Sequence, residues 1–399
     1  MKIRRHTLIS KKGNNLRTFY EFFAGGGMVR SGLGADWSCL FANDFDPKKA
    51  ASYQANWGSD EILVDDIRNV GIDDLLGYAD LVWGSFPCQD LSLAGGGAGL
   101  GGDRSGTFYP FISAVKELIS DGRPPRIIAL ENVVGTLTSH KGADFQAICQ
   151  ALFDLDYSFG AVVVDAAAFL PQSRPRLFVI ALHSATVAPY RLTCTAPKAP
   201  WHTKALCRAQ ASLGAHLRSK WIWWNLPDAP VRQMDLCDII EENPASVTWH
   251  TARETTALLS MMSEVNLAKV ETAKLAKTKM VGTIYKRTRH EHGIKVQRAE
   301  IRFDHIAGCL RTPAGGSSRQ LIMVVEGNKI RSRLISSRET ARLMGLPDSY
   351  KLPERYNQAY HLTGDGVAVP VVRFIANSIL EPCLSNSTEE ASGHESHTL

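Results

Sequence analysis

A cysteine and a glutamate are the two residues whose setting points most directly to chemistry. Cys88 closes Ser85-Phe86-Pro87-Cys88, which follows the apolar run Leu81–Gly84. Because Pro87 fixes its own backbone angle and restrains the residue before it, a stiffened turn would present the thiol. Glu131 follows a second apolar run, Arg126–Leu130. A lone cysteine is more often a small buried apolar residue, so the accompanying carboxyl is what favours a nucleophile.

A pyrimidine ring is the substrate that this pair would suit. Carbon 6 of cytosine is poorly electrophilic until N3 is protonated, and a partly desolvated Glu131 can hold that proton near neutral pH. Addition of the Cys88 thiolate makes carbon 5 nucleophilic, so that it can take a methyl group from a sulfonium donor. Arg174 and Arg176 precede another apolar run and are candidates to bind the base carbonyl and a phosphate. Two solvated surface arginines are the alternative.

The residues after Cys88 are too rich in glycine to build core. Residues 94–102 read Ala-Gly-Gly-Gly-Ala-Gly-Leu-Gly-Gly. Such a sequence suggests a mobile lid that closes on an active site. At its far end, Asp103-Arg104-Ser105 would contact a phosphate in the closed state. A bland linker is the competing interpretation, and it would be preferred if Cys88 were absent.

A glycine turn ends the first predicted strand, Thr18–Phe23. The turn Ala24–Gly27 allows close approach of a ligand to the backbone, at the edge where open α/β sheets bind ligands. A dinucleotide fingerprint counted from Gly25 needs glycine at its sixth position, where Arg30 stands. The turn therefore predicts a small ligand and argues against a dehydrogenase.

Acidic and aromatic residues at the next strand ends would complete this ligand site. Asp44 ends the second strand, where its carboxylate can accept hydrogen bonds from ribose hydroxyls, and Phe45 can cover an adenine. Asp66 is placed to accept from the adenine amino group. The alternative is a glycine turn with surface acids, which the three features together make less favourable.

The elements that must position these residues alternate from Arg17 to Leu182. Short apolar runs and helical stretches follow one another, which predicts an α/β fold with a doubly wound, mostly parallel sheet. The expected strands are Thr18–Phe23, Ser38–Ala42, Leu81–Gly84, Arg126–Leu130, Ala161–Val164 and Leu177–Leu182. The expected helices are Met28–Leu33, Pro47–Asn56, Phe111–Ile119, Phe145–Phe153, Glu339–Met344 and Val367–Leu380.

A second, smaller module is expected after this alternation stops. We expect a discontinuous first domain over residues 1–185 and 362–383, a second domain over 186–361, and a disordered tail over 384–399. The tryptophans Trp221, Trp223 and Trp224 in the second region are more typical of core than of base stacking. Its basic residues are candidates for phosphates and guanine edges, or form a solvated face: Lys286, Arg287, Arg289, Lys295, Arg298 and Arg302.

Composition narrows the class of protein. The chain has 399 residues, a net charge of +5 and a pI near 8.7, which permit a polyanionic partner without requiring one. Eight cysteines without a C-x-x-C pair argue against a zinc cluster, and we expect no metal. We expect no secretory signal and no run apolar enough to cross a bilayer, so an intracellular location is expected.

A collinear set of motifs over most of the chain resembles the bacterial cytosine-5 DNA methyltransferases of restriction–modification systems. The motifs are Phe23-Ala24-Gly25-Gly26-Gly27, Asn43-Asp44-Phe45-Asp46, Asp66-Ile67, Gly84-Ser85-Phe86-Pro87-Cys88-Gln89, Glu131-Asn132-Val133, Gln172-Ser173-Arg174-Pro175-Arg176 and Leu310-Arg311-Thr312-Pro313-Ala314-Gly315-Gly316. The ordered set is far more specific than any one motif.

The resemblance implies a Rossmann-like methyltransferase that uses S-adenosylmethionine and no metal. Cys88 would be the nucleophile, Glu131 would protonate the base, Arg176 would contact it and Arg174 would support the site. The implied cofactor contacts are Phe23, Ala24, Gly25, Gly27, Asp44, Phe45, Asp66, Ile67, Pro87 and Asp365. The implied DNA contacts are Gln89, Ser92, Arg104, Arg287, Arg289 and Arg302. The family's closing motif normally reads Gly-Asn-Ser-Val, whereas this chain has Gly364-Asp365-Gly366-Val367.

Double-stranded DNA with a flipped cytosine is the implied substrate, and residues 186–301 are the implied target-recognition region. The resemblance also suggests a monomer in a bacterial cytoplasm, associated with the nucleoid, and a cognate restriction endonuclease that acts on the same site without binding. An RNA cytosine methyltransferase is the main alternative, because relatives with the same motifs act on transfer RNA, but their recognition regions are usually compact. A non-catalytic DNA-binding protein would be expected to lose Cys88 or Glu131.

Overall fold

The computed structural model describes residues 16–87, 105–291, 293–311 and 319–385. Cys88, Gln89, Ser92, Arg104 and the glycine-rich segment 94–102 lie outside the described residues, as does most of the motif that begins at Leu310. The expected disordered tail 384–399 also lies almost entirely outside them. The roles expected for these residues therefore stay predictions.

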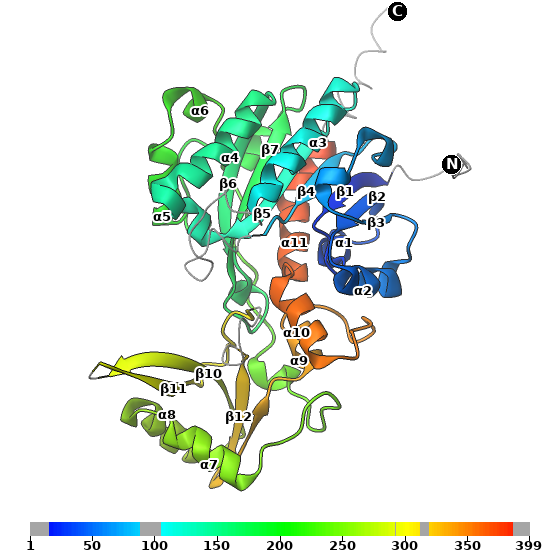
Figure 1. The fold of residues 1–399 in the computed structure, drawn as a ribbon. Helices are drawn as coiled ribbons and strands as arrows, with labels where there is room; N and C mark the ends of the chain where they lie inside the picture. The colour runs from blue at the N-terminus through cyan, green and yellow to red at the C-terminus, as the bar shows by residue number, and fades with distance from the viewer. Residues whose placement is uncertain (1–15, 88–104, 292, 312–318, 386–399) are drawn as a thin grey trace, which may run out of the picture.

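A seven-stranded sheet forms the centre of the larger part of the molecule (Figure 1). Its strands are β1 (Arg17–Phe22), β2 (Trp37–Asp44), β3 (Ile62–Val64), β4 (Leu81–Gly84), β5 (Ile127–Val133), β6 (Tyr157–Asp165) and β7 (Pro175–His183). The order is β3-β2-β1-β4-β5-β7-β6. The first five strands are parallel, whereas β7 is antiparallel to both of its neighbours. This confirms the expected α/β, mostly parallel sheet.

Helices cover both faces of this sheet with two separate apolar layers. One layer holds side chains of α3 (Phe108–Ser120) and α4 (Ala143–Asp154). The other holds those of α1 (Met28–Leu33) and α2 (Pro47–Trp57). Helix α2 shows how a few neighbouring residues determine where such a helix begins. The Asp46 carboxylate caps its first turn by accepting from Lys48 N at 2.8 Å, and Pro47 provides a preset backbone angle.

The C-terminal helices complete the second layer, as expected for the end of a discontinuous first domain. They are α10 (Tyr356–Asp365), α11 (Val369–Ile375), a π-helical stretch over Ala376–Leu380 and α12 (Glu381–Ser385). Helix α11 packs closely on α1 because Gly32 has no side chain, and a Cβ there would lie 2.5 Å from that of Val372. By length and composition the run Tyr356–Ser385 passes as a membrane span, contrary to the expectation, but 61% of its most apolar window is buried in the protein. A buried core helix satisfies the same test.

A four-stranded antiparallel sheet of order β11-β10-β12-β13 lies apart from the first (Figure 1). Its strands are β10 (Met280–Glu291), β11 (Ile294–Arg302), β12 (Leu321–Glu326) and β13 (Lys329–Leu334). Helices α7 (Ala252–Ser260) and α8 (Glu264–Lys274) pack on it and share its own apolar core. No strand of this sheet was among those expected from the alternation.

Side chains beyond the expected boundary at residue 185 pack in the core of the first sheet. Helices α5 (Lys204–Ala211) and α6 (Ala215–Ser219) contribute to the α3 and α4 layer, and β8 (Thr193–Cys194) pairs with β9 (Trp223–Trp224). Trp224 is fully buried, which confirms the expected core role for that residue. The independent apolar core of the second sheet spans residues 258–325, so it is smaller than the region 186–361. The domain division itself stays a prediction.

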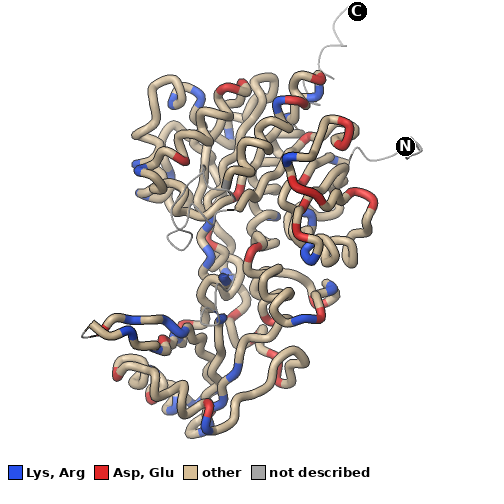
Figure 2. The backbone as a smooth tube through the Cα atoms, in the orientation of Figure 1, with Lys and Arg blue, Asp and Glu red and all other residues tan. Residues whose placement is uncertain are grey.

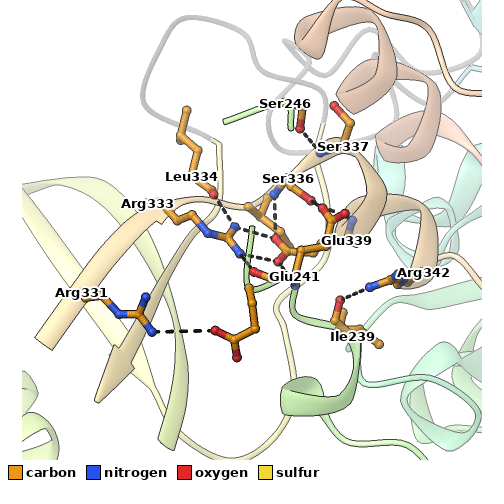
Figure 3. A network of polar contacts seen from close by, with 12 residues as sticks. Ile239, Glu241, Ser246, Arg331, Arg333, Leu334, Ser336, Ser337, Glu339 and Arg342 are labelled. Carbon is orange, nitrogen blue, oxygen red and sulfur yellow. Dashed lines mark hydrogen bonds and ion pairs between the residues drawn. The ribbon is translucent and has the colours of Figure 1, made fainter. Parts of the chain in front are cut away.

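A buried ionic network joins the second sheet to α9 (Ser337–Arg342), as Figure 3 shows. The side chains of Arg333 and Glu339 have 0% exposure and form a two-pronged pair, with distances of 2.6 and 2.8 Å. The Glu339 carboxylate also accepts from the backbone N–H groups of Ser336 and Glu241. Arg333 in turn donates to Glu241 O at 2.8 Å. These contacts therefore hold three parts together at one point: strand β13, helix α9 and the segment around Glu241 that precedes α7.

Candidate active site

Strands β4 and β5 bring the segment before Cys88 against Glu131. The strands are parallel neighbours, and their pairing ends with Gly84 opposite Leu130. The next residues of the two strands, Ser85 and Glu131, therefore lie side by side. The Ser85 side chain lies close enough to the Glu131 carboxylate to lower the pKa of Glu131, and Asn132 Nδ2 donates to Phe86 O at 3.4 Å. The residues that lead to Cys88 are thus held beside the carboxyl with which the thiol is expected to act.

Glu131 is a buried carboxyl in contact with an arginine. It is 8% exposed, and its Oε1 lies 3.0 Å from Arg176 Nε. Burial raises the pKa of Glu131, and the charges of Arg176 and Arg174 offset only part of that rise. The expected strand end at Leu130 is wrong, because β5 continues to Val133 through pairing with β7. Glu131 is therefore fixed within a strand, which makes its position more rigid than a loop would.

Arg174 and Arg176 are not solvated surface side chains. Arg174 is 2% exposed; its Nη1 donates to Leu310 O at 3.0 Å, and its Nη2 donates to Gly364 O at 2.8 Å and Gly366 O at 2.6 Å. Arg174 thus ties the start of β7 to the closing motif and to the segment 309–311. This arrangement suits a supporting role, whereas Arg176 is the arginine that contacts Glu131.

Two residues of this cluster were not among the predicted site residues. Gln172 has 0% exposure; its Oε1 accepts from Leu310 N at 3.0 Å and its Nε2 donates to Leu343 O at 2.6 Å. Arg174 Nη1 also lies 3.3 Å from Cys309 Sγ. Burial raises the pKa of the Cys309 thiol, but the charges of Arg174 and Arg176 outweigh it, so the pKa lies below its ordinary value. Nothing local distinguishes this cysteine among the eight in the sequence.

The glycine turn carries backbone conformations that side chains rarely adopt. Phe23 has φ of 60°, Gly25 of 56° and Gly27 of 75°, and a non-glycine residue in this region stores strain typical of functional sites. The carbonyl of Gly26 is held from two sides, because Tyr350 OH donates to it at 2.7 Å and Trp57 Nε1 at 3.3 Å. A Cβ on Gly25 would meet nothing within 4 Å. The turn is therefore clamped on its inner side and open at Gly25.

Asp44 lies directly under this turn. Its Oδ2 accepts from Gly25 N at 2.8 Å and its Oδ1 accepts from Asp46 N at 2.8 Å. Burial raises the pKa of Asp44, and the charge of Lys49 opposes that rise. Phe45 is 67% exposed, so its ring is available to cover a planar group. These residues fit the adenosine part of the expected cofactor, which needs acceptors for ribose hydroxyls beside an aromatic surface.

Other predicted cofactor contacts already have partners in the protein. Arg68 forms a two-pronged pair with the Asp66 carboxylate, and these hydrogen bonds lower the pKa of Asp66. The Ile67 side chain is 4% exposed and lies in the core, so only its backbone is placed to contact a ligand. Asp365 Oδ2 pairs with Lys49 Nζ at 2.7 Å. Ala24 follows β1 and Pro87 follows β4, so both lie beyond the carboxyl ends of these parallel strands.

Metal-ligating side chains do not cluster in the described part of the chain. Among those residues, no group of three or more His, Cys, Asp or Glu side chains is arranged to hold an ion. The predicted DNA contacts Arg287, Arg289 and Arg302 lie on β10 and β11, and each is paired with an acid. These arginines belong to the second sheet, whereas Glu131 and Arg176 lie on strands of the first.

Comparison with known proteins gives a consistent result. The model of the family described as C-5 cytosine-specific DNA methylase matches residues 17–381. The type II methyltransferase M.HhaI of Haemophilus parahaemolyticus is 25% identical over 366 residues, covering 90% of this chain and 93% of that protein. M.BsuFI of Bacillus subtilis is 26% identical over 370 residues, covering 92% and 73% respectively.

Solved structures share the fold. A mutant of DNMT2 from Spodoptera frugiperda superposes with a TM-score of 0.57 at 16% identity, over 92% of this chain and 100% of that chain. A DNA modification methyltransferase, described as putative and encoded within an Escherichia coli prophage, gives a TM-score of 0.54 at 15% identity, over 94% and 99%. Identities this low establish the architecture alone.

Proposed function

This chain belongs to the C-5 cytosine-specific DNA methylase family, and on that premise we propose that it methylates a flipped cytosine in a specific duplex site through a covalent Cys88 adduct. As a DNA cytosine-5 methyltransferase with type II relatives, it would be the modification enzyme of a restriction–modification system. The observation that carries the mechanism is the buried Glu131, held by Arg176 beside the segment that leads to Cys88.

S-adenosylmethionine is the proposed cofactor, and it would supply an electrophilic methyl group. The backbone at Phe23, Gly25 and Gly27 would receive it at the open side of the glycine turn. Asp44 would accept hydrogen bonds from the ribose, and Phe45 would cover the adenine. Asp66 can join them only through oxygen lone pairs that Arg68 leaves available.

The proposed reaction starts with Cys88 and Glu131 acting together on one cytosine. The Cys88 thiolate adds to carbon 6 while the Glu131 carboxyl gives its proton to N3, so that carbon 5 becomes the nucleophile. After carbon 5 has gained the methyl group, its proton leaves to solvent, the bond to sulfur breaks, and N3 returns its proton to Glu131. Arg176 keeps the carboxylate in place between these steps, and Arg174 holds the surrounding segments.

The base must leave the duplex for this chemistry, because carbon 6 is inaccessible within the stack. Flipping costs a few kcal/mol of lost stacking, which contacts from Gln89, Ser92, Arg104 and the second sheet would offset. We further propose that the enzyme acts as a monomer in the bacterial cytoplasm, near the nucleoid. A cognate endonuclease would recognise the same site without binding this chain.

Trapping with 5-fluorocytosine tests the covalent mechanism. Duplex DNA with 5-fluorocytosine at the target should form a stable adduct, because no proton can leave carbon 5, and Cys88→Ser should form none. The target is found first by mapping methylated cytosines in DNA from cells that express the protein, and adducts are read as a mass shift on a denaturing gel. An equal adduct with Cys88→Ser, or faster methylation of transfer RNA than of the duplex, would contradict the proposal.

A further inference from the structure

The hairpin of β10 and β11 extends beyond the sheet to which it belongs. Strand β10 pairs with β12 only from Met280 to Ile284, whereas its pairing with β11 continues to Glu291. The part of the hairpin from Tyr285 to Glu300 therefore projects as a two-stranded arm (Figure 1). Figure 2 shows lysine and arginine positions along both strands of this arm. A two-stranded ribbon has the width that the major groove of duplex DNA admits.

The two faces of the arm have different roles. One face carries Ile284, Ala299 and Ile301 into the core beneath α7 and α8. Because side chains alternate along a strand, the opposite face carries Arg287 and Arg289 from β10. From β11 it carries Arg298, Glu300 and Arg302. This second face is the one that does not pack on the helices.

Two contacts connect the charged face to the candidate active site. Tyr285, two residues before Arg287 on the same face, donates its hydroxyl to Cys309 O at 2.6 Å. Cys309 in turn contacts Arg174. A duplex whose target base enters the site beside Glu131 would therefore have its neighbouring base pairs next to this face.

Glu300 organises the arginines at the centre of the arm. Arg289 Nε donates to Glu300 Oε1 at 2.6 Å, and its Nη2 reaches the same oxygen. Arg287 Nε lies 3.3 Å from Glu300 Oε2. Both arginine side chains remain about half exposed, at 48% and 50%. One carboxylate thus fixes two arginines while leaving both accessible.

The way Arg289 uses its donors determines what it can still bind. The Nε edge is engaged by Glu300, whereas Nη1 and the outer hydrogen of Nη2 point away from that edge. These donors form the end-on fork that matches O6 and N7 of guanine. The paired acids, Glu291, Glu300 and Asp304, cancel most of the charge of the four arginines on this face. A nearly neutral face is poorly suited to phosphates, so base edges are the better match.

We propose that Glu300 is a positioning residue for sequence specificity, which holds Arg287 and Arg289 so that they read guanines in the major groove and withholds them from phosphates. This inference rests on the proposed function, because it assumes that the duplex is the substrate. It implies that the target site contains guanine near the modified cytosine.

Glu300→Gln in the full chain tests this role, with Glu271→Gln as the matched control. Glu271 lies on α8, where it pairs with Lys274, so its substitution removes the same charge on the side of the sheet opposite the charged face. We expect Glu300→Gln to bind a random-sequence duplex several-fold more tightly with a steeper salt dependence. The ratio of methylation at the target to that at sites with one altered guanine should fall by about tenfold or more. Glu271→Gln should leave this ratio unchanged.

Base substitution separates specificity from a structural effect. Replacing a target guanine by 7-deazaguanine removes N7, and we expect this to weaken binding of the wild type but to have much less effect on Arg289→Ala. An unchanged specificity ratio in Glu300→Gln, or equal sensitivity of wild type and Arg289→Ala to every 7-deazaguanine, would overturn the inference. If the wild type neither methylates DNA nor forms the 5-fluorocytosine adduct, the proposed function fails instead.

Discussion

Glu131 shows at the scale of one residue how burial and charge compete. Desolvation raises the pKa of this carboxyl, and Arg176 at 3.0 Å prevents the rise from being larger. Because only the protonated form can give a proton to N3, methylation should decline as the pH rises through the pKa of Glu131. We expect Glu131→Gln to lower the rate by about 100-fold to 10,000-fold and to remove this alkaline decline. Single-turnover methylation measured across pH is the test.

Binding measurements provide the control for this prediction. Glu131→Gln keeps the shape of the side chain, so cofactor affinity should change little. A variant that retains the same alkaline decline would show that another group controls it, and the assignment of Glu131 as the proton donor would then be wrong.

Helix α2 and the closing motif at the end of α10 are connected at the scale of elements by the pair of Lys49 and Asp365. Lys49 also lies close enough to Asp44 to oppose the rise in that residue's pKa. In Asp365→Asn, Lys49 loses its partner and should turn toward Asp44, which weakens S-adenosylmethionine binding. The double variant Lys49→Met with Asp365→Asn should recover part of that loss. The coupling energy should be below about 1 kcal/mol, because the pair is partly exposed.

Calorimetric titration of S-adenosylmethionine into the four proteins of this cycle measures the coupling. Strictly additive effects would show that the pair is a surface contact without influence on the cofactor site. In that case the departure from the family's asparagine would be neutral.

At the scale of the whole molecule, the pair of Arg333 and Glu339 determines how the second sheet is attached (Figure 3). Both side chains are fully buried, so Glu339→Gln leaves a guanidinium charge without compensation. We expect it to lower the free energy of unfolding by about 3–5 kcal/mol. Glu242→Gln, whose side chain is 60% exposed and pairs with Lys279, should cost less than about 1 kcal/mol. Urea denaturation of both variants is the comparison, and equal losses would contradict the anchoring role.

Much of the first sheet follows from local patterns. Strands β1, β4 and β7, and helices α1 and α2, were expected close to their observed bounds, because apolar alternation, caps and glycine turns act within a few residues. Strands β10 and β11 were missed because charged side chains interrupt their apolar positions, so neither forms an apolar run. Their inward side is defined only by α7 and α8, which lie elsewhere in the sequence.

The sequence by itself determined which residues could act, since the motifs around Cys88, Glu131 and the glycine turn are short and each has a local physical reason. Only the tertiary structure decided their partners. The contacts of Arg174 with Gly364 and Gly366, of Lys49 with Asp365, and of Glu300 with two arginines join side chains across strands or distant segments. Such contacts depend on how the elements pack, and a local pattern carries no information about which distant side chain will lie opposite.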